Sequence, residues 1–251
     1  MSFRILFSNL GYARGIDGSL WQHICRFNRH FYCSVPLQQQ ALSQARDIIR
    51  AEKPDLCCFV EIDQGSYHSA YFNQVKFLLD GDYRYFDVAE KYGPNSWLGR
   101  MPLHIGKSSA FMAKREFPFE RRYFSSGSKR LIHHVDLPGG VSLFFTHFSL
   151  NGKIRARQFR EMRALVQEKD RPVIIMADFN ILRGFPELAP LLEGTGLKVM
   201  NRDKDYTFTL HRKAWVLDLC LCSESLVPAL SLQIIPQPFS DHAALLVTGE
   251  W

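Results

Sequence analysis

The stretch PFSDHAALLV, residues 238–247, places an acid and an imidazole at the start of a short apolar run. Residues 243–247 are apolar at every position, and such a run predicts a strand that is buried on both faces. Asp241 and His242 come immediately before that strand, where packing alone requires no ionisable group. On its own, a Ser-Asp-His triplet is explained as well by a turn followed by a half-exposed histidine. The role of the pair therefore depends on what the other predicted strands carry at their ends.

Length and composition predict one soluble globular domain. Hydrophobic residues make up 46% and charged residues 22% of the 251 positions, which is ordinary for such a domain. No low-complexity tract, charge block or internal repeat interrupts the chain, so we expect a single domain over residues 1–251. No apolar stretch reaches membrane-spanning length and the amino terminus lacks a cleavable leader, which predicts a cytoplasmic protein without a transmembrane segment.

Cysteine content and net charge narrow the class further. Four of the six cysteines lie inside apolar strand-like runs, where thiols behave as small core residues, so we expect them to be reduced. The formal net charge of +6 favours an anionic partner. Net charge alone does not identify whether that partner is nucleic acid, a phospholipid headgroup or a phosphorylated small molecule. The sequence also leaves the oligomeric state unknown.

The pattern of apolar residues predicts a strand-rich α/β fold. About ten short strand-like runs recur along the chain. Residues 38–53, 67–80 and 154–168 carry the apolar stripe of helices that lie on a sheet. This is too many strands for a simple alternation of strand and helix, and it suits two packed sheets with helices on their outer faces.

The ends of the predicted strands are polar in a way that a core does not require. The junction residues are Asn9, Glu61, Thr146 with His147, Asp178 with Asn180, Asp218, and Asp241 with His242. Each such group would have to be buried and paired, which costs folding free energy unless the site is used. Taken singly, the same residues are explained as turn formers, helix caps or solvent-facing strand ends.

The order N, E, TH, DFN, LD, SDH resembles the endonuclease/exonuclease/phosphatase superfamily of metal-dependent phosphoesterases. Its members include pancreatic-type deoxyribonucleases, apurinic endonucleases, inositol polyphosphate 5-phosphatases and neutral sphingomyelinases. The resemblance extends from Asn9 to His242, and its most specific parts are ADFN (177–180) and SDH (240–242). It implies a four-layered α/β sandwich of two packed, mostly antiparallel sheets with helices on the outer faces.

The resemblance also implies a metal site. Glu61 would be the principal ligand of Mg²⁺, for which Mn²⁺ could substitute, because a hard divalent cation prefers oxygen ligands. Asn9 would lie beside it, and Asp241 would close the site directly or through water. The acid that some family nucleases carry two positions after the first Asn is Gly11 here, which weakens any case for a second metal.

Catalytic roles follow from the same resemblance. Asp178 would orient and deprotonate the attacking water, and Asn180 would donate to the phosphate or hold the nucleophile. Asp218 would fix the tautomer and orientation of His242. His147 would donate a hydrogen bond to the phosphate or act near the leaving group. The phosphate-proximal Tyr of the apurinic endonucleases has no assignable position, which disfavours a repair role.

Two segments are candidates for substrate binding. The insert SLWQHICRFNRHFYCS, residues 19–34, could overhang the site as a lip, with Trp21 and Arg26 as contacts. The predicted helix after Thr146-His147 carries Arg155 among several arginines. A packed surface loop and a solvated helix face are the plain alternatives for the two segments.

These observations predict a metal-dependent hydrolase that cleaves a phosphoester, a phosphodiester rather than a monoester, by in-line attack of an activated water. One alternative is an endonuclease or exonuclease acting on DNA or RNA. Another is a catalytically inactive binding or scaffold protein of the same fold. The presence of every junction residue disfavours the inactive protein, since decayed enzymes first lose ligands or the imidazole.

Overall fold

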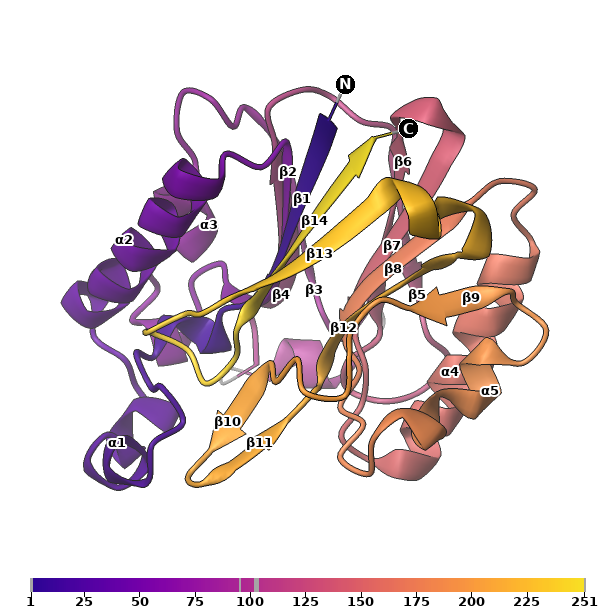
Figure 1. The fold of residues 1–251 in the computed structure, drawn as a ribbon. Helices are drawn as coiled ribbons and strands as arrows, with labels where there is room; N and C mark the ends of the chain where they lie inside the picture. The colour runs from indigo at the N-terminus through magenta and orange to yellow at the C-terminus, as the bar shows by residue number, and fades with distance from the viewer. Residues whose placement is uncertain (1, 95, 102–103, 251) are drawn as a thin grey trace.

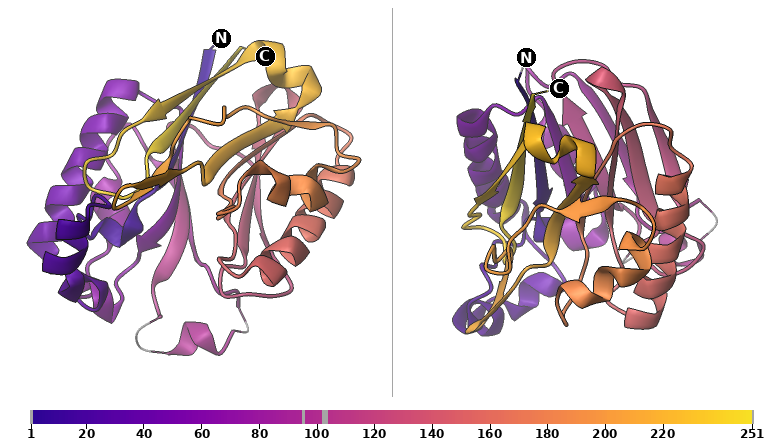
Figure 2. Two further views of the ribbon diagram at one scale, coloured as in Figure 1. Left: turned by 60° about the horizontal axis from the view of Figure 1, so that its bottom comes forward. Right: turned by 45° about the vertical axis from the view of Figure 1, so that its right-hand side comes forward.

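Two six-stranded β-sheets pack face to face in the computed structural model, which describes residues 2–94, 96–101 and 104–250 (Figures 1 and 2). Helices cover the outer face of each sheet, so the layers run helix, sheet, sheet, helix (Figure 2). The predicted α/β sandwich is therefore confirmed. Within the described ranges, no helix combines the length and apolarity needed to cross a bilayer.

The first sheet has the strand order β13-β14-β1-β2-β4-β3. Its strands are β1 (Ser2–Asn9), β2 (Leu56–Asp63), β3 (Tyr85–Glu90), β4 (Lys107–Ala113), β13 (Leu230–Ile235) and β14 (Ala244–Glu250). β1 and β2 pair in parallel, and the other neighbours pair antiparallel. The apolar run that follows Asp241-His242 is thus a strand, as predicted.

The second sheet has the order β5-β6-β7-β8-β12-β9. Its strands are β5 (Phe119–Tyr123), β6 (Leu131–Leu137), β7 (Val141–His147), β8 (Val173–Asp178), β9 (Leu197–Val199) and β12 (Asp218–Ser223). Only β7 and β8 pair in parallel. A separate hairpin consists of β10 (Phe208–Leu210) and β11 (Lys213–Trp215).

Helices α2 and α3 flank the first sheet, and α4 and α5 flank the second (Figure 1). Their bounds are α2 Val35–Glu52, α3 Gln74–Leu78, α4 Gly152–Gln167 and α5 Ala189–Leu192, with α1 at Leu20–Cys25. Short 3₁₀ turns are η1 Gly11–Ala13, η2 Phe27–His30, η3 Tyr67–Ser69, η4 Leu98–Arg100, η5 Pro138–Gly140, η6 Phe185–Leu188 and η7 Glu224–Ala229. α2 and α4 confirm the expected helices at 38–53 and 154–168.

The helix expected over 67–80 is wrong in its first half. The backbone there forms only η3, because Ala70 and Tyr71 take positive φ angles of 52° and 59°. A left-handed residue cannot continue an α-helix. The helix begins afresh at α3, where the side chain of Asn73 caps the backbone N–H of Lys76.

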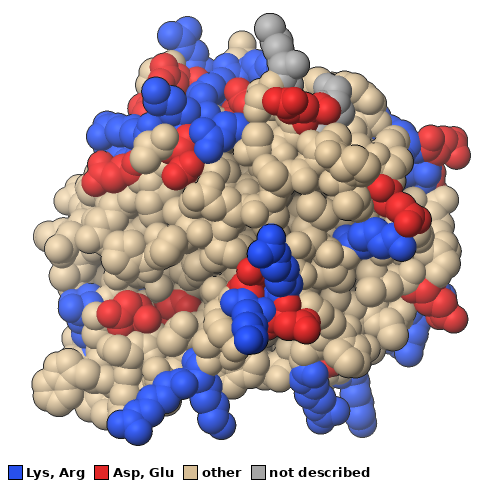
Figure 3. All heavy atoms as spheres, in the orientation of Figure 1, with Lys and Arg blue, Asp and Glu red and all other residues tan. Residues whose placement is uncertain are grey.

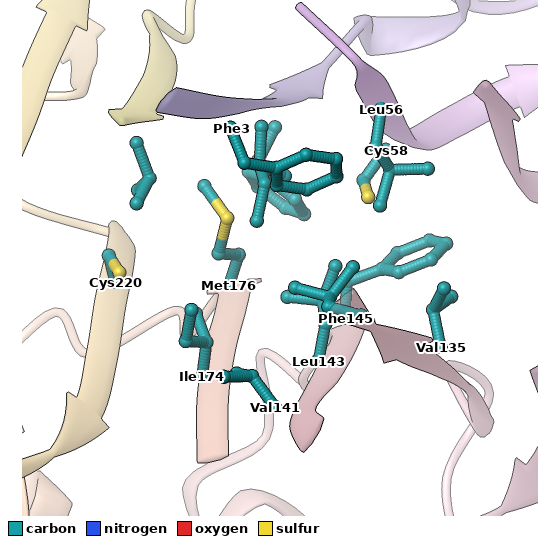
Figure 4. Packing of buried hydrophobic residues seen from close by; sticks show 14 of the residues in the cluster. Phe3, Leu56, Cys58, Val135, Val141, Leu143, Phe145, Ile174, Met176 and Cys220 are labelled. Atoms are coloured by element: carbon teal, nitrogen blue, oxygen red, sulfur yellow. The ribbon is translucent and has the colours of Figure 1, made fainter. Parts of the chain in front are cut away.

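The central core lies between the two sheets. Phe3 and Leu56 project from the first sheet towards Val135, Phe145 and Met176 of the second (Figure 4). Five of the cysteines are buried and all six are unpaired in the structure, consistent with their expected role as small core residues. Burial of this apolar surface is what holds the two sheets at a fixed separation and register.

A buried polar contact also joins the sheets. Asp87 on β3 accepts a hydrogen bond from Arg121 Nε of β5 at 2.8 Å, and its Oδ2 lies 3.1 Å from His133 Nε2 of β6. The His133 ring stacks on Phe145, with ring centroids 4.5 Å apart. Burial alone would raise the pKa of Asp87, but the hydrogen bonds from Arg121 and His133 lower it well below its usual range.

We expect Asp87→Asn to lower the free energy of unfolding by about 1–3 kcal/mol at pH 7, because the buried His133 and the more exposed Arg121 lose their charged acceptor. A carboxyl whose pKa is depressed by folding contributes stability above its unfolded pKa, and that contribution is lost as the pH falls. The deficit of the variant should therefore shrink below about pH 4. Urea unfolding at several pH values measures it, with the exposed Asp82→Asn as the control. A deficit independent of pH would contradict the assigned pKa shift.

Candidate active site

The polar strand ends of both sheets meet at the end of the molecule opposite the two chain termini, below in Figure 1. In the second sheet Asp178 is paired in register with His147 on one side and with Asp218 on the other. Asn9 and Glu61 arrive from the parallel strands β1 and β2 of the first sheet. Parallel neighbours end at the same edge, so the topology itself brings these groups together.

Asp218 and His242 form a buried pair at the site. His242 Nδ1 donates to Asp218 Oδ2 at 2.6 Å, and the backbone N–H of Asp218 donates to Thr207 Oγ1 at 2.8 Å. Burial alone would lower the pKa of His242, but the carboxylates of Asp218 and Asp178 raise it to about 10. The imidazole is therefore cationic at neutral pH, with Asp218 holding its orientation.

Asp178 lies at the centre of the hydrogen-bond network. Its Oδ2 lies 2.9 Å from His147 Nε2 and accepts from Asn9 Nδ2 at 3.1 Å, while Oδ1 accepts from the backbone N–H of Asn180 at 3.1 Å. His242 Nε2 stands 4.0 Å from the same Oδ2. Burial acts to raise the pKa of Asp178, but His147 and His242 hold it well below its usual range. Asp178 is thus an ionised acceptor.

Glu61 occupies a strained position beside this network. It has a positive φ of 52° at a bulge in β2, where the pairing with β4 shifts between Phe59 and Ile62. Left-handed backbone at a non-glycine residue is costly and persists where surrounding structure enforces it, often at functional sites. The bulge turns the carboxylate towards the site, where Oε1 lies 3.7 Å from His147 Nδ1.

Several cations surround Glu61. Lys129 Nζ and Arg14 Nη2 lie 3.7 and 3.8 Å from its carboxylate, and Lys129 also contacts His147 Nε2. Lys91 donates to the hydroxyl of Tyr12 at 2.5 Å. Burial would raise the pKa of Glu61, yet these cations and His147 lower it well below its usual range. We name Arg14, Lys91 and Lys129 the cation cluster.

Sequence reasoning did not assign the cation cluster to the site. Burial and the neighbouring Lys129 and Lys107 lower the pKa of Lys91 to about 7, with Glu61 opposing. A sequence signal was present, since Lys91 directly follows the end of β3 and Arg14 follows the Asn9 junction. Scanning strand ends for cations as well as for acids would have found both.

Asn180 is buried at the site, whereas Asp241 is half-exposed. Asn180 has a positive φ of 54°, and its side chain donates to the carbonyl of Phe148 at 2.9 Å, so it fixes the backbone after His147. A primary amide has a second N–H that could reach a phosphate. Asp241 is half-exposed and lines a small hollow with Gly11 and Arg14.

Two sets of side-chain atoms near the site are candidates for binding a metal ion: those of Asp178, Asp218 and His242, and the carboxylate of Glu61. Ligand atoms of Asp178, Asp218 and His242 lie within 4.8 Å of one another. His242 and Asp218 are bonded to each other at 2.6 Å, however, and a metal there would break that bond. The cationic neighbours of Glu61 stand at 3.7–3.8 Å, longer than hydrogen bonds, which leaves oxygen lone pairs for a hard cation. Glu61 therefore fits the role of a metal ligand, and a metal would share or replace its contacts with Arg14 and Lys129.

Of the three residues expected to bind substrate, Arg155 and Arg26 form hydrogen bonds with other parts of the protein itself. Arg155 is 4% exposed and donates to the carbonyls of Ser149 and Leu150 at 3.0 and 2.9 Å and to Glu187. This burial does not support a substrate contact and corrects the expectation. Arg26 donates to Gly15 and Gln22 within the lip. Trp21 is 74% exposed, as a lip residue should be.

Comparison with known proteins agrees with this architecture. A sequence model of the Endonuclease/Exonuclease/phosphatase family matches residues 36–242, whereas no curated protein sequence matches the chain. Humanized TDP2 of D. rerio superposes with a TM-score of 0.67 at 16% identity, over 100% of this chain and 99% of that chain. An endonuclease/exonuclease/phosphatase from Bacteroides vulgatus gives 0.65 at 14% identity over 100% and 99%. The endonuclease domain of TRAS1, a telomere-specific non-LTR retrotransposon, gives 0.59 at 13% over 99% and 99%. Identities this low show a shared fold.

The structural role of Arg155 can be measured directly. Arg155→Ala should lower the free energy of unfolding by about 3 kcal/mol, because it leaves Glu187 and two loop carbonyls without their donor. Arg157→Ala, an exposed arginine two positions along α4, should change it by less than about 0.5 kcal/mol. Chemical denaturation of both variants compares them. Equal stability of the two would contradict the buried placement of Arg155.

Proposed function

The chain belongs to the Endonuclease/Exonuclease/phosphatase family, and from that premise we propose that it is a Mg²⁺-dependent hydrolase that cleaves a phosphodiester. One observation carries the proposal: Asp218, His242, Asp178, Asn9 and His147 form a continuous buried network beside the Glu61 carboxylate. Buried ionisable groups cost folding free energy, so their assembly at one site is expected where they act on a substrate.

Glu61 would hold the metal together with Asp241 and the side-chain oxygen of Asn9. The bound cation would polarise the phosphoryl oxygens and neutralise the charge that develops on them. Asn9 Oδ1 accepts from the backbone N–H of Gly11 at 3.0 Å, which directs its amide nitrogen towards Asp178 and its oxygen to the side of Gly11. Mn²⁺ has similar ligand preferences and is expected to substitute.

His242 would act on the phosphate as a fixed cationic donor. Its Nδ1 is used by Asp218, which leaves Nε2 facing Asn9 at 3.4 Å and Asp178 at 4.0 Å. A preorganised donor in a buried site stabilises developing negative charge without reorganising during the reaction. The Asp218 carboxylate is thus a positioning group for the imidazole.

Asp178 would align the attacking water and accept its proton. Among the described residues, its carboxylate accepts from Asn9 and Asn180 and contacts His147; a carboxylate offers about four acceptor sites, so a water would take the remaining site or displace one of these partners. His147 is the partner best placed to yield, because it also contacts Lys129 and faces Glu61. The cation cluster would bind the remaining phosphoryl oxygens.

Chelation is the first test. Hydrolysis of bis(p-nitrophenyl) phosphate should disappear in EDTA and return when Mg²⁺ or Mn²⁺ is added in excess. The physical reason is that phosphoryl oxygens repel a nucleophile unless a cation neutralises them. Circular dichroism in EDTA serves as the control for folding. A rate that is indifferent to EDTA would refute metal dependence, and absence of turnover with every metal would favour a scaffold protein.

The second test removes the buried pair. His242→Ala and Asp218→Asn should each lower kcat by roughly 10²–10⁴-fold, the range for loss of a positioned acid–base group. Asp203→Asn, an exposed carboxylate near the same end of the molecule, is the matched control and should keep the parental rate. Thermal melts establish that the variants fold. A near-parental kcat in either buried variant would show that its assigned role is wrong.

A further inference from the structure

Exposed large apolar side chains are concentrated at one end of the molecule. We define the rim as the segments at the strand ends that carry the candidate active site: residues 11–34, 64–73, 91–94, 96–101, 104–106, 124–130, 148–153, 179–184, 201–217 and 236–243. Among the described residues, all but four of the exposed large apolar side chains belong to these segments. The four exceptions are Tyr85, Phe86, Phe119 and Val227.

The largest group lies on the lip. Leu20, Trp21, Ile24, Phe27 and Phe31 are 52–74% exposed. Phe27 and Phe31 pack edge to face with ring centroids 5.5 Å apart, so their orientation is fixed. Large apolar side chains held in solvent mark an interaction site.

The lip is fastened to neighbouring parts of the rim. His211 N donates to the carbonyl of Gly18 at 2.7 Å, which ties the lip to the β10–β11 hairpin. Between them lies an apolar cavity of about 670 Å³, lined by Leu20, Leu210 and Trp215 among others. α1 and the hairpin lie at the end of the molecule away from the two chain termini (Figure 1). The exposed apolar side chains of the lip and the apolar cavity beside the hairpin thus lie at the same end.

Several other rim loops carry one to three exposed apolar residues each. Trp97, Leu150 and Leu182 are 69%, 61% and 46% exposed and follow β3, β7 and β8 respectively. They lie around the candidate active site and not in one continuous patch. A partner that contacts all of them must be broad and must face the mouth of the site.

Charge on the rim is predominantly positive. The described rim residues include seven exposed Lys or Arg, among them Arg183, Arg212 and Lys213, and one exposed acid, Asp203. Lys and Arg side chains project from the lower edge of the molecule in Figure 3. The partner is therefore anionic as well as able to accept apolar side chains.

The chemistry of the exposed groups separates the candidate partners. Single-stranded nucleic acid is bound by aromatic faces that stack on bases, but Leu20, Ile24, Leu150 and Leu182 have no such faces. A second copy of the chain would present the same positive rim and repel it. Mixed aliphatic and aromatic tips set among cations are the composition of surfaces that lie in the interface of an anionic bilayer.

We propose that the rim docks onto an anionic phospholipid surface and presents the candidate active site to a phosphoester at the depth of the headgroups. The docking itself needs no catalysis; the identification of the headgroup as the substrate rests on the proposed function. Trp21, Phe27 and their apolar neighbours enter the interface, while Arg212 and Lys213 contact lipid phosphates.

Co-sedimentation with vesicles tests the docking separately from the chemistry. The full chain is incubated in EDTA with vesicles of phosphatidylcholine alone or with added phosphatidylserine, and the bound fraction is measured. We expect binding to the anionic vesicles, weakened by salt. The double variant Trp21→Ala/Phe27→Ala should lower the partition coefficient by about tenfold or more, as should Arg212→Glu/Lys213→Glu.

Phe86→Ala removes an exposed aromatic outside the rim and should leave the partition coefficient unchanged. Thermal melts and circular dichroism show that the rim variants remain folded. Failure to bind anionic vesicles, or binding that the rim variants do not weaken, overturns the docking even if soluble hydrolysis stands. Loss of oligonucleotide binding in the same variants without vesicle binding would assign the rim to nucleic acid, and a dimer abolished by them would assign it to a second copy.

Discussion

The hydrogen bond from Asn9 to Asp178 joins the two sheets where every other part of the site assembles. Asn9 ends β1 in the first sheet and Asp178 ends β8 in the second, and the bond between them is 3.1 Å long. It exists only while the two apolar faces are packed in register, because a shift of one sheet by a residue would separate the amide from the carboxylate. The polar site therefore forms only when the central apolar core holds the two sheets in register.

Charged groups are arranged differently between the sheets and at the candidate active site. Asp87, Arg121 and His133 form a compact group between the sheets, in which each charge has a partner. At the site, Glu61 and Asn180 have left-handed backbone, and cations gather around one carboxylate. Left-handed backbone at non-glycine residues and closely spaced cations both destabilise a fold. We expect to find them together at a site where a bound ligand compensates for their cost. Stability is supplied by the core and function by the strand ends.

Much of this architecture could be predicted from the sequence, since strand periodicity and polar strand ends depend on local pattern. The structure brings the junction residues together as that pattern indicates. Burial of Arg155 could not be predicted, because Arg155 and Arg157 look alike in sequence and only packing of α4 against the following loops distinguishes them. The break at Ala70 and Tyr71 lacks the glycine that normally signals a positive φ. Lys91 directly follows the end of β3, a position that marks it as a candidate, but its bond to Tyr12 joins segments far apart in the chain and could not be predicted from local pattern.

The buried cation cluster and the exposed rim cations differ in how strongly salt screens their charge. The cation cluster lies in a buried setting where attraction to a phosphate is screened little by salt, so it acts on a ligand already in the site. The exposed rim cations act through solvent, where a Debye length of about 8 Å at physiological salt confines them to a surface nearly in contact. Rim charge can therefore orient the molecule on an anionic surface without holding the reacting phosphate, and the apolar tips supply the salt-independent part of that contact. The two proposals, docking on a surface and binding of a phosphoester, therefore rest on physically separate groups of charges.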